Sequence, residues 1–168
     1  GSTLSDDFVA EYEYYNFGSG AINLYHFVLA AGTSHVGNNN VNQDFIAVSD
    51  ANPNKHYIKY KDGSSNIVSS LESNTMSSNT QYYNTLIRDG QDLTLTMYTD
   101  PARTSVHDTL TLTISGTVDG LNTLHHSALD IGGGTSGYDY KVRDVIIYDG
   151  TTSPTASSTI ISATGLTD

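Results

Sequence analysis

Apolar and polar residues alternate one by one along much of this chain. In residues 92–100 (DLTLTMYTD), Leu93, Leu95 and Met97 are separated by threonines, and residues 108–115 (DTLTLTIS) repeat the pattern. Successive side chains of a β-strand point to opposite faces of the sheet. This period of two therefore predicts half-buried antiparallel strands, with one face on a core and the other toward solvent or a ligand.

Similar segments extend this prediction to most of the chain. We expect further strands at 6–15, 23–32, 43–50, 56–63, 81–88, 122–132 and 138–150. The Asp89-Gly90 pair predicts a tight hairpin, because both residues tolerate the positive φ angles of such turns. No window has the apolar spacing of an amphipathic helix, and Tyr and β-branched residues, which favour strands, are abundant. The predicted fold is all-β, a two-sheet antiparallel jelly-roll sandwich.

The length of 168 residues suits one domain with a sizeable core. We place this domain at residues 3–150 and regard Gly1-Ser2 as a cloning remnant. Residues 151–168 are rich in Ser and Thr, and they form either a linker out of a longer protein or a surface return. Whether residues 158–163 add a last strand is left open.

The strand expected at 138–150 (YDYKVRDVIIYDG) has an irregular apolar pattern. In a regular strand, Val142 faces opposite to Val145 and Ile147. Either both faces of this strand are covered, or a β-bulge after Val142 resets the register.

Charge and composition exclude several functions. The formal net charge of −11 repels phosphate backbones and anionic lipids, so we expect no nucleic-acid partner. No apolar run approaches the ~20 residues of a membrane-spanning helix, so we expect no membrane insertion. Cysteine is absent, which excludes disulfides and thiolate metal sites. No Asn-x-Ser/Thr glycosylation signal is present, which favours a prokaryotic or viral source.

The segment YYNTLIRDGQDLTLTMYTD (82–100), followed by YKVRDVIIYDG (140–150), resembles the concanavalin A-like lectin/glucanase superfamily, particularly its laminin-G-like and pentraxin-like branch. In that branch a strand, an Asp-Gly hairpin, a strand ending in a Tyr-x-Asp turn and a late Ile-Asp-Asp-Val-x-Ile-Tyr strand recur in this order. The chain departs from this pattern, because Arg143 replaces the first Asp of the late strand, Ile146 replaces a polar residue, and Trp is absent.

The resemblance implies a jelly roll of two curved sheets that binds glycans on its concave face or at loop tips, often with calcium. Members are often non-catalytic modules of secreted, cell-surface or viral proteins. We therefore expect a non-catalytic glycan-binding module of a larger extracellular, cell-surface or virion-surface protein. The alternative is a structural or adhesive protein-protein interaction domain that binds no sugar.

The sequence predicts no enzyme and no catalytic residues. The enzymatic branch of the superfamily uses a Glu-x-Asp-x-x-Glu strand, whereas here only Glu11 and Glu13 are spaced by two, with no Asp between or just after them. We expect these two glutamates to form a solvated strand face. No Gly-x-Ser-x-Gly motif is present.

The histidines are scattered, with no His-x-His pair on one strand face, so the sequence gives no sign of a transition-metal site. His26 lies in the apolar segment LYHFVL and is expected to be a hydrogen-bonded core residue.

Two groups of residues are candidates for ligand contacts. Tyrosine presents a flat apolar ring with a hydroxyl tip, which suits stacking on sugars, although it also fills half-buried sheet positions. The chain has 12 Tyr, and those in polar surroundings, together with two loop asparagines, form our candidate set: Tyr15, Asn39, Asn40, Tyr57, Tyr60, Tyr98 and Tyr138. Calcium prefers loop carboxylates, so Asp44 and Asp100 are the candidate calcium ligands, unless they only shape turns.

Overall fold

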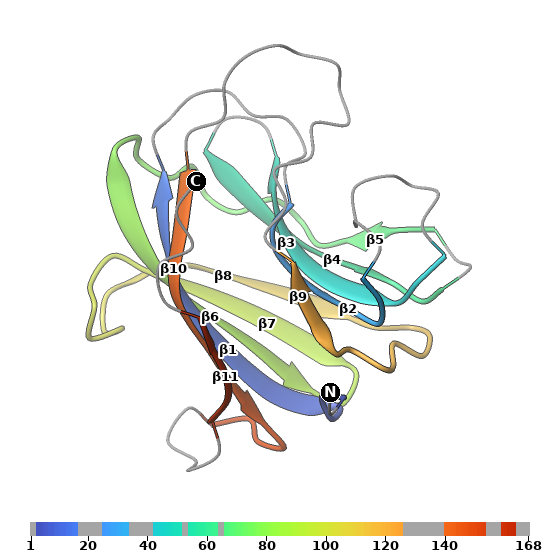
Figure 1. Ribbon diagram of the computed structural model, residues 1–168. Coiled ribbons are helices and arrows are strands. Elements are labelled where there is room, and N and C mark those ends of the chain that lie inside the picture. Colours follow the sequence, from blue (N-terminus) through green and yellow to red (C-terminus); the bar gives the residue numbers. More distant parts are fainter. Residues whose placement is uncertain are drawn as a thin grey trace.

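The computed structural model describes residues 3–16, 25–33, 42–51, 54–63, 66–125, 140–153 and 159–163. In these ranges the chain forms two antiparallel sheets that pack face to face, with no helix (Figure 1). It accordingly contains no helix, among the residues described, that could cross a membrane. The predicted all-β, two-sheet antiparallel sandwich is confirmed.

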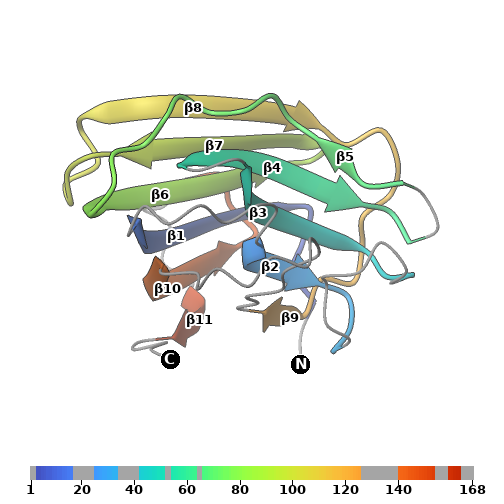
Figure 2. The same ribbon diagram turned by 90° about the horizontal axis from the view of Figure 1, so that it is seen from above.

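One sheet has six strands and the other has five, and Figure 2 shows both orders from above. The six-stranded sheet is ordered β11 (Thr159–Ala163), β10 (Tyr140–Asp149), β1 (Asp7–Asn16), β6 (Thr80–Asp89), β7 (Asp92–Tyr98) and β8 (Val106–Thr113). The five-stranded sheet is ordered β5 (Val68–Ser69), β4 (Lys55–Lys61), β3 (Phe45–Ala51), β2 (Tyr25–Ala30) and β9 (Thr123–His125).

Most expected strands form. Within the segment 158–163, which the sequence left open, Thr159–Ala163 form β11 at the edge of the six-stranded sheet. Of the strand expected at 122–132, β9 covers Thr123–His125, and residues 126–132 lie outside the described ranges. The two-residue β5 was not predicted, because a strand this short carries no periodic pattern.

The core between the sheets follows the alternation seen in the sequence. Leu93, Leu95 and Met97 of β7 are all fully buried, while the threonines between them are half-buried on the outer face. Each such side chain contributes roughly 1.5–3 kcal/mol when removed from water. The five-stranded sheet supplies the opposite half of this core. The half-buried strands predicted from the period of two are confirmed.

The hairpin at Asp89-Gly90 forms one residue later than predicted. Asp89 pairs with Asp92, so Gly90 and Gln91 are the two turn residues. Gly90 has φ of 58°, whereas Asp89 and Gln91 are not among the residues with positive φ. A positive φ at the first central residue alone is the pattern of a type II′ turn, which needs glycine there and not at both positions.

A β-bulge in β10 resolves the irregular pattern of the late strand. Glu11 pairs with Ile146 and Glu13 with Arg143, so two residues of β10 lie opposite one residue of β1. Asp144 takes the left-handed conformation there, with φ of 50°. The extra residue lets Val142, Val145 and Ile147 all face the core, each at most 1% exposed. The second of the two predicted explanations is therefore the correct one.

Candidate functional site

Strand β1 sends its side chains alternately to the core and to the outer face of the six-stranded sheet. Tyr12 and Tyr14 are buried against the opposite sheet, whereas Glu11, Glu13 and Tyr15 lie half-buried on the outer face. The segment EYEYY thus divides its tyrosines between the two environments, as a period of two requires. The outer face of β1 is where predicted binding residue Tyr15 lies.

Tyr15 forms one wall of a surface hollow of about 300 Å³, which Gln81, Lys141 and Arg143 complete. We call it the β1–β10 pocket. Tyr15 is paired with Gln81 of β6 on one side and with Lys141 of β10 on the other, so all three side chains emerge on the same face. The pocket therefore combines an aromatic ring, an amide and two cations.

A polar network fixes the floor beside this pocket. The Arg143 Nη2 atom donates to Glu13 Oε2 and to Gln81 Oε1, each at 3.0 Å, and Gln81 Nε2 donates to Glu13 Oε2 at 2.7 Å. Because each member contacts the other two, the Arg143 and Gln81 side chains are held in place before a ligand arrives. This preorganisation lowers the entropy that binding costs.

The two glutamates of β1 are more engaged than the sequence predicted. Glu13 forms an ion pair with Arg143, and Glu11 lies 3.4 Å from Arg103 Nε, in the loop between β7 and β8. Their side chains are only 23% and 14% exposed. The expected solvated strand face is corrected to an ion-paired, half-buried one, because arginines from two other segments reach the same face.

Two further tyrosines share this outer face. Tyr83 of β6 pairs with Glu13 on one side and with Tyr98 of β7 on the other, and both rings are half-buried. Neighbouring strands lie about 4.8 Å apart, so Tyr15, Tyr83 and Tyr98 span roughly 10 Å across three strands. Tyr98 was predicted and Tyr83 was not, although Tyr83 shares its face with Gln81 by the same period of two.

The structure places the two other described tyrosines of the candidate set elsewhere. Tyr60 is 1% exposed and its hydroxyl lies 2.9 Å from Ser115 Oγ, so the expected strand-edge position is corrected to a core position. Tyr57 lies on the five-stranded sheet, where it donates to Glu72 Oε1 at 2.7 Å and has Lys59 Nζ 5.4 Å from its ring centre. Neither residue joins Tyr15 and Tyr98.

Three predicted ligand residues, Asn39, Asn40 and Tyr138, lie outside the described ranges.

The two candidate calcium ligands, Asp44 and Asp100, are not brought together. Asp44 accepts the Asp119 amide at 2.8 Å, near the loop that follows the C-terminal end of β8. Asp100 follows the C-terminal end of β7, and β7 and β8 are antiparallel, so the two residues lie at opposite ends of the sheet. Within the residues described, neither belongs to a convergent group of three metal-binding side chains.

The Asp100 carboxylate shapes its own loop. It accepts the backbone amides of Thr104 at 3.0 Å and Ser105 at 2.6 Å. These hydrogen bonds, led by that of Ser105, lower the pKa of Asp100. These are the contacts of a residue that shapes a turn, which was the alternative role given for Asp100.

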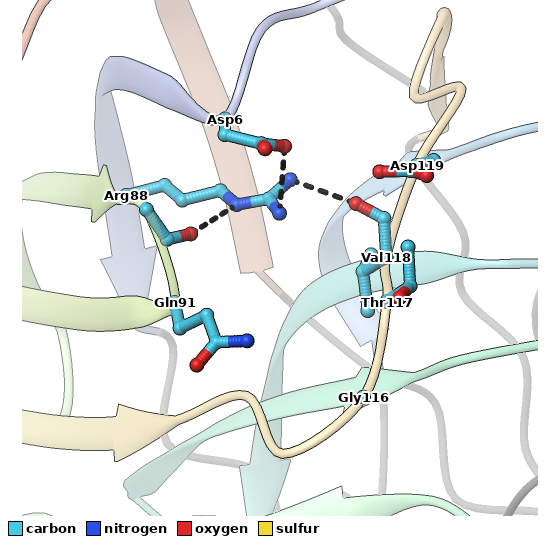
Figure 3. A pocket seen from close by; sticks show the side chains of 8 residues that line it. Asp6, Arg88, Gln91, Gly116, Thr117, Val118 and Asp119 are labelled. Atoms are coloured by element: carbon cyan, nitrogen blue, oxygen red, sulfur yellow. Dashed lines mark hydrogen bonds and ion pairs between the residues drawn. The ribbon is translucent and has the colours of Figure 1, made fainter.

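Figure 3 shows a second hollow, of about 160 Å³. Its residue Arg88 lies near the end of β6, whereas Gln81 of the β1–β10 pocket lies near the start of that strand. Arg88 extends across this second hollow and is only 4% exposed. Its guanidinium contacts Asp6 Oδ1 at 3.0 Å, the Gly90 carbonyl at 2.9 Å and the Val118 carbonyl at 2.9 Å. These contacts connect Asp6, the β6–β7 hairpin and the 114–121 loop. We therefore interpret Arg88 as a residue that stabilises the fold and not as a ligand-binding cation.

Comparisons with known proteins support the fold. The enzymatically active domain of tailspike protein 2 from bacteriophage CBA120 is similar, with a TM-score of 0.50 and 12% sequence identity over 86% of this chain and 22% of that chain. The full-length tailspike protein 2 from an Escherichia coli O157:H7 bacteriophage gives a TM-score of 0.52 at 12% identity, again over 86% of this chain and over 20% of that chain.

At this identity the likeness shows the fold alone. The chain spans about a fifth of the length of each tailspike structure. No protein-family model matches the chain, and no curated protein matches it significantly in sequence. The chain is therefore a two-sheet antiparallel sandwich that is structurally similar to a region of a phage tailspike.

Proposed function

We propose that this chain is a non-catalytic glycan-binding module of a longer virion-surface protein, and that it binds its glycan on the outer face of the six-stranded sheet. The observation that carries this proposal is the β1–β10 pocket, where Tyr15 stands beside Gln81, Lys141 and Arg143. The same face continues into Tyr83 and Tyr98.

The chemistry of this face suits sugars. The apolar face of a pyranose ring stacks on tyrosine, and amide, guanidinium and ammonium groups donate hydrogen bonds to hydroxyl and carboxylate oxygens. Three half-buried rings across three strands provide several contacts for an extended chain. Residues 82–100 and 140–150 resemble concanavalin A-like modules, and this resemblance supports a glycan as the ligand. We also propose on this basis that the chain belongs to that superfamily.

The tailspike likeness supports the proposed virion-surface setting. Both similar structures are phage tailspike proteins several times longer than this chain, which agrees with a module inside a larger assembly. The proposed function is non-catalytic, because the glucanase carboxylate motif is absent and both glutamates on the outer face of β1 are ion-paired with arginines.

Calcium is a separate part of the proposal. The β1–β10 pocket is lined by two cations, which disfavour a divalent ion there. A calcium ion would therefore bind at acidic loops such as those of Asp44 and Asp100. It would not contact the glycan beside Tyr15.

The test is a glycan array with neutral and acidic polysaccharides, run with calcium and again with chelator. We expect saturable binding that is retained in chelator and reduced at least tenfold by Tyr15→Ala and by Lys141→Ala. Tyr57→Ala, on the other sheet, is the matched control and should bind as the unmodified protein does. Binding that is lost in chelator, or that survives Tyr15→Ala, would contradict this site.

A second candidate function is supported by exposed apolar side chains. Leu71 is 87% exposed and lies three residues after Val68, which is 36% exposed, beside the five-stranded sheet. A contiguous patch of exposed apolar side chains is typical of contacts with another protein, and Leu71 and Val68 would belong to such a patch. The absence of binding to every glycan on the array would favour this structural or adhesive role within a larger protein.

A further inference from the structure

Three side chains with metal-binding atoms meet inside the sandwich. Asp50 Oδ1 lies 3.3 Å from His26 Nδ1 and 3.0 Å from His56 Nε2. One ligand atom from each of these three residues lies within 4.8 Å of the other two, and no other such group of three exists in the part of the chain that the structure describes. We call this group the His-Asp-His cluster.

The strand register brings the cluster together. Asp50 on β3 is the direct partner of His56 on β4, so the two side chains emerge on the same face. On the other side of β3, the pairing of β2 shifts between Tyr25 and Phe27, and His26 is the residue at that irregularity. A bulge redirects a side chain, which explains how His26 and its neighbour Phe27 are both buried next to the core.

The cluster is deeply buried. Exposed fractions are 1% for His26, 7% for Asp50 and 0% for His56. A buried carboxylate is costly unless it is paired or bound to a metal. Although His56 Nε2 lies close to Asp50 Oδ1, it makes no hydrogen bond in the structure, and neither does His56 Nδ1. His56 is thus a buried imidazole, and its contact with Asp50 does not have the alignment of a hydrogen bond.

A second layer of polar groups orients the cluster. The Tyr12 hydroxyl lies 3.3 Å from His26 Nε2, and the Tyr14 hydroxyl donates to Asp50 Oδ2 at 3.1 Å. Metal-binding histidines commonly use their second ring nitrogen for such a contact, and metal-binding carboxylates are commonly hydrogen-bonded in turn. With these contacts His26 keeps Nδ1, and Asp50 keeps Oδ1, directed at the centre of the cluster.

The rings around the cluster are tightly packed. The centres of His26 and His56 are 4.4 Å apart, and the Tyr14 ring lies 4.6 Å from each of them. Within this packed environment Asp50 Oδ1 contacts both imidazoles, so one carboxylate and two imidazole nitrogens converge on one point.

We propose that the His-Asp-His cluster binds one divalent first-row transition metal ion, with Zn²⁺ as the preferred ion, and that this ion is structural. Two imidazoles and one carboxylate supply three of the four ligands that Zn²⁺ takes, and this donor set disfavours calcium, which takes oxygen ligands. The ion would join three adjacent strands of the five-stranded sheet. Because the cluster is deeply buried, the ion would enter while the chain folds.

This site was not predicted from the sequence, because the chain contains no His-x-His pair on one strand. The three ligands come from three strands, and they are separated by 24 residues and then by 6, so only the sheet register makes them neighbours. The proposal is independent of glycan binding, because the cluster faces the core and the β1–β10 pocket lies on the outer face of the other sheet.

The test uses the full chain without an affinity tag. The protein is unfolded in denaturant with a chelator, freed of both, and refolded with or without Zn²⁺ or Co²⁺. We expect one metal ion per chain by elemental mass spectrometry, visible absorption bands of bound Co²⁺, and a higher Tm for the metal-loaded protein. His56→Gln and Asp50→Asn should each weaken Co²⁺ binding at least tenfold.

His107→Gln is the matched control, because His107 lies outside the cluster and contacts Tyr82 instead. It should bind Co²⁺ as the unmodified protein does. Unmodified protein that refolds to the same Tm with and without metal, and that retains no Zn²⁺ or Co²⁺, would overturn the proposal and leave a buried hydrogen-bonding network. If the two cluster variants do not fold, the metal content and the Tm shift of the unmodified protein still decide between these outcomes.

Discussion

The two faces of β1 use one kind of side chain for different purposes. Tyr14, on the inner face, is 2% exposed and donates its hydroxyl to Asp50. Tyr15, the next residue, is half-buried on the outer face and lines the β1–β10 pocket. Their chemistry is identical, so their different roles come only from the pleat of the strand. Tyrosine content alone therefore does not identify a binding surface.

The largest expected difference between the two faces is in stability. Tyr12 is fully buried and stacks on Phe27, with ring centres 4.8 Å apart and planes at 7°. Tyr12→Ala removes this packing and leaves a cavity, so we expect the free energy of unfolding to fall by about 3–5 kcal/mol. Tyr15→Ala should change it by about 1 kcal/mol or less. Urea unfolding of both variants measures the difference, and equal losses would mean that Tyr15 also belongs to the core.

A smaller change isolates the hydroxyl from the ring. Tyr14→Phe keeps the packing and removes the donor to Asp50 Oδ2, which leaves a buried carboxylate oxygen without that hydrogen bond. We expect a loss of about 2 kcal/mol in the free energy of unfolding, because hydrogen bonds to buried charged groups are among the stronger ones. Tyr15→Phe is the control on the outer face and should be close to neutral. A neutral Tyr14→Phe would show that another group satisfies Asp50.

The sequence predicted those features of the two faces that follow from the local alternation of apolar and polar residues. The period of two placed Leu93, Leu95 and Met97 in the core and Tyr98 on the outer face, because burial of apolar side chains follows directly from alternation. The bulge after Val142 was one of the two explanations predicted for the irregular pattern, because Val142, Val145 and Ile147 share a face only if the strand contains an extra residue.

Other features depend on contacts far apart in the sequence. Tyr60 was expected at a polar strand edge, but it is covered by the segment around Ser115, which no local pattern reveals. The His-Asp-His cluster is hidden for the same reason, because its residues become neighbours only through the register of three strands. The Arg143 contact with Glu13 likewise requires the pairing of the first long strand with the last long strand.

The bulge of β10 places Val142, Val145 and Ile147 on the inner face, and substitutions of Asp144 test whether it needs a left-handed residue. Asp144 has φ of 50° and is exposed, so its backbone, and not its packing, determines which substitutions are tolerated. Asp144→Val places a β-branched residue in the left-handed conformation, and we expect it to lower the free energy of unfolding by about 1–2 kcal/mol. Asp144→Gly should cause no loss. If the valine variant is as stable as the glycine variant, the bulge does not require this conformation.

The smallest effect concerns the loop that lies against the outer face of β1. Arg103 reaches Glu11 from the 99–105 loop, and Asp100 orders that loop through the amides of Ser105 and Thr104. Because these contacts lower the pKa of Asp100 in the folded protein, they favour folding above the usual Asp pKa, and this contribution is lost as the pH falls through the lowered value. In an acid titration followed by NMR, the Ser105 and Thr104 amide signals should move together at a pH below the usual Asp pKa. Asp100→Asn should abolish that transition, while a transition at the usual Asp value in the unmodified protein would mean that Asp100 does not hold the loop against β1.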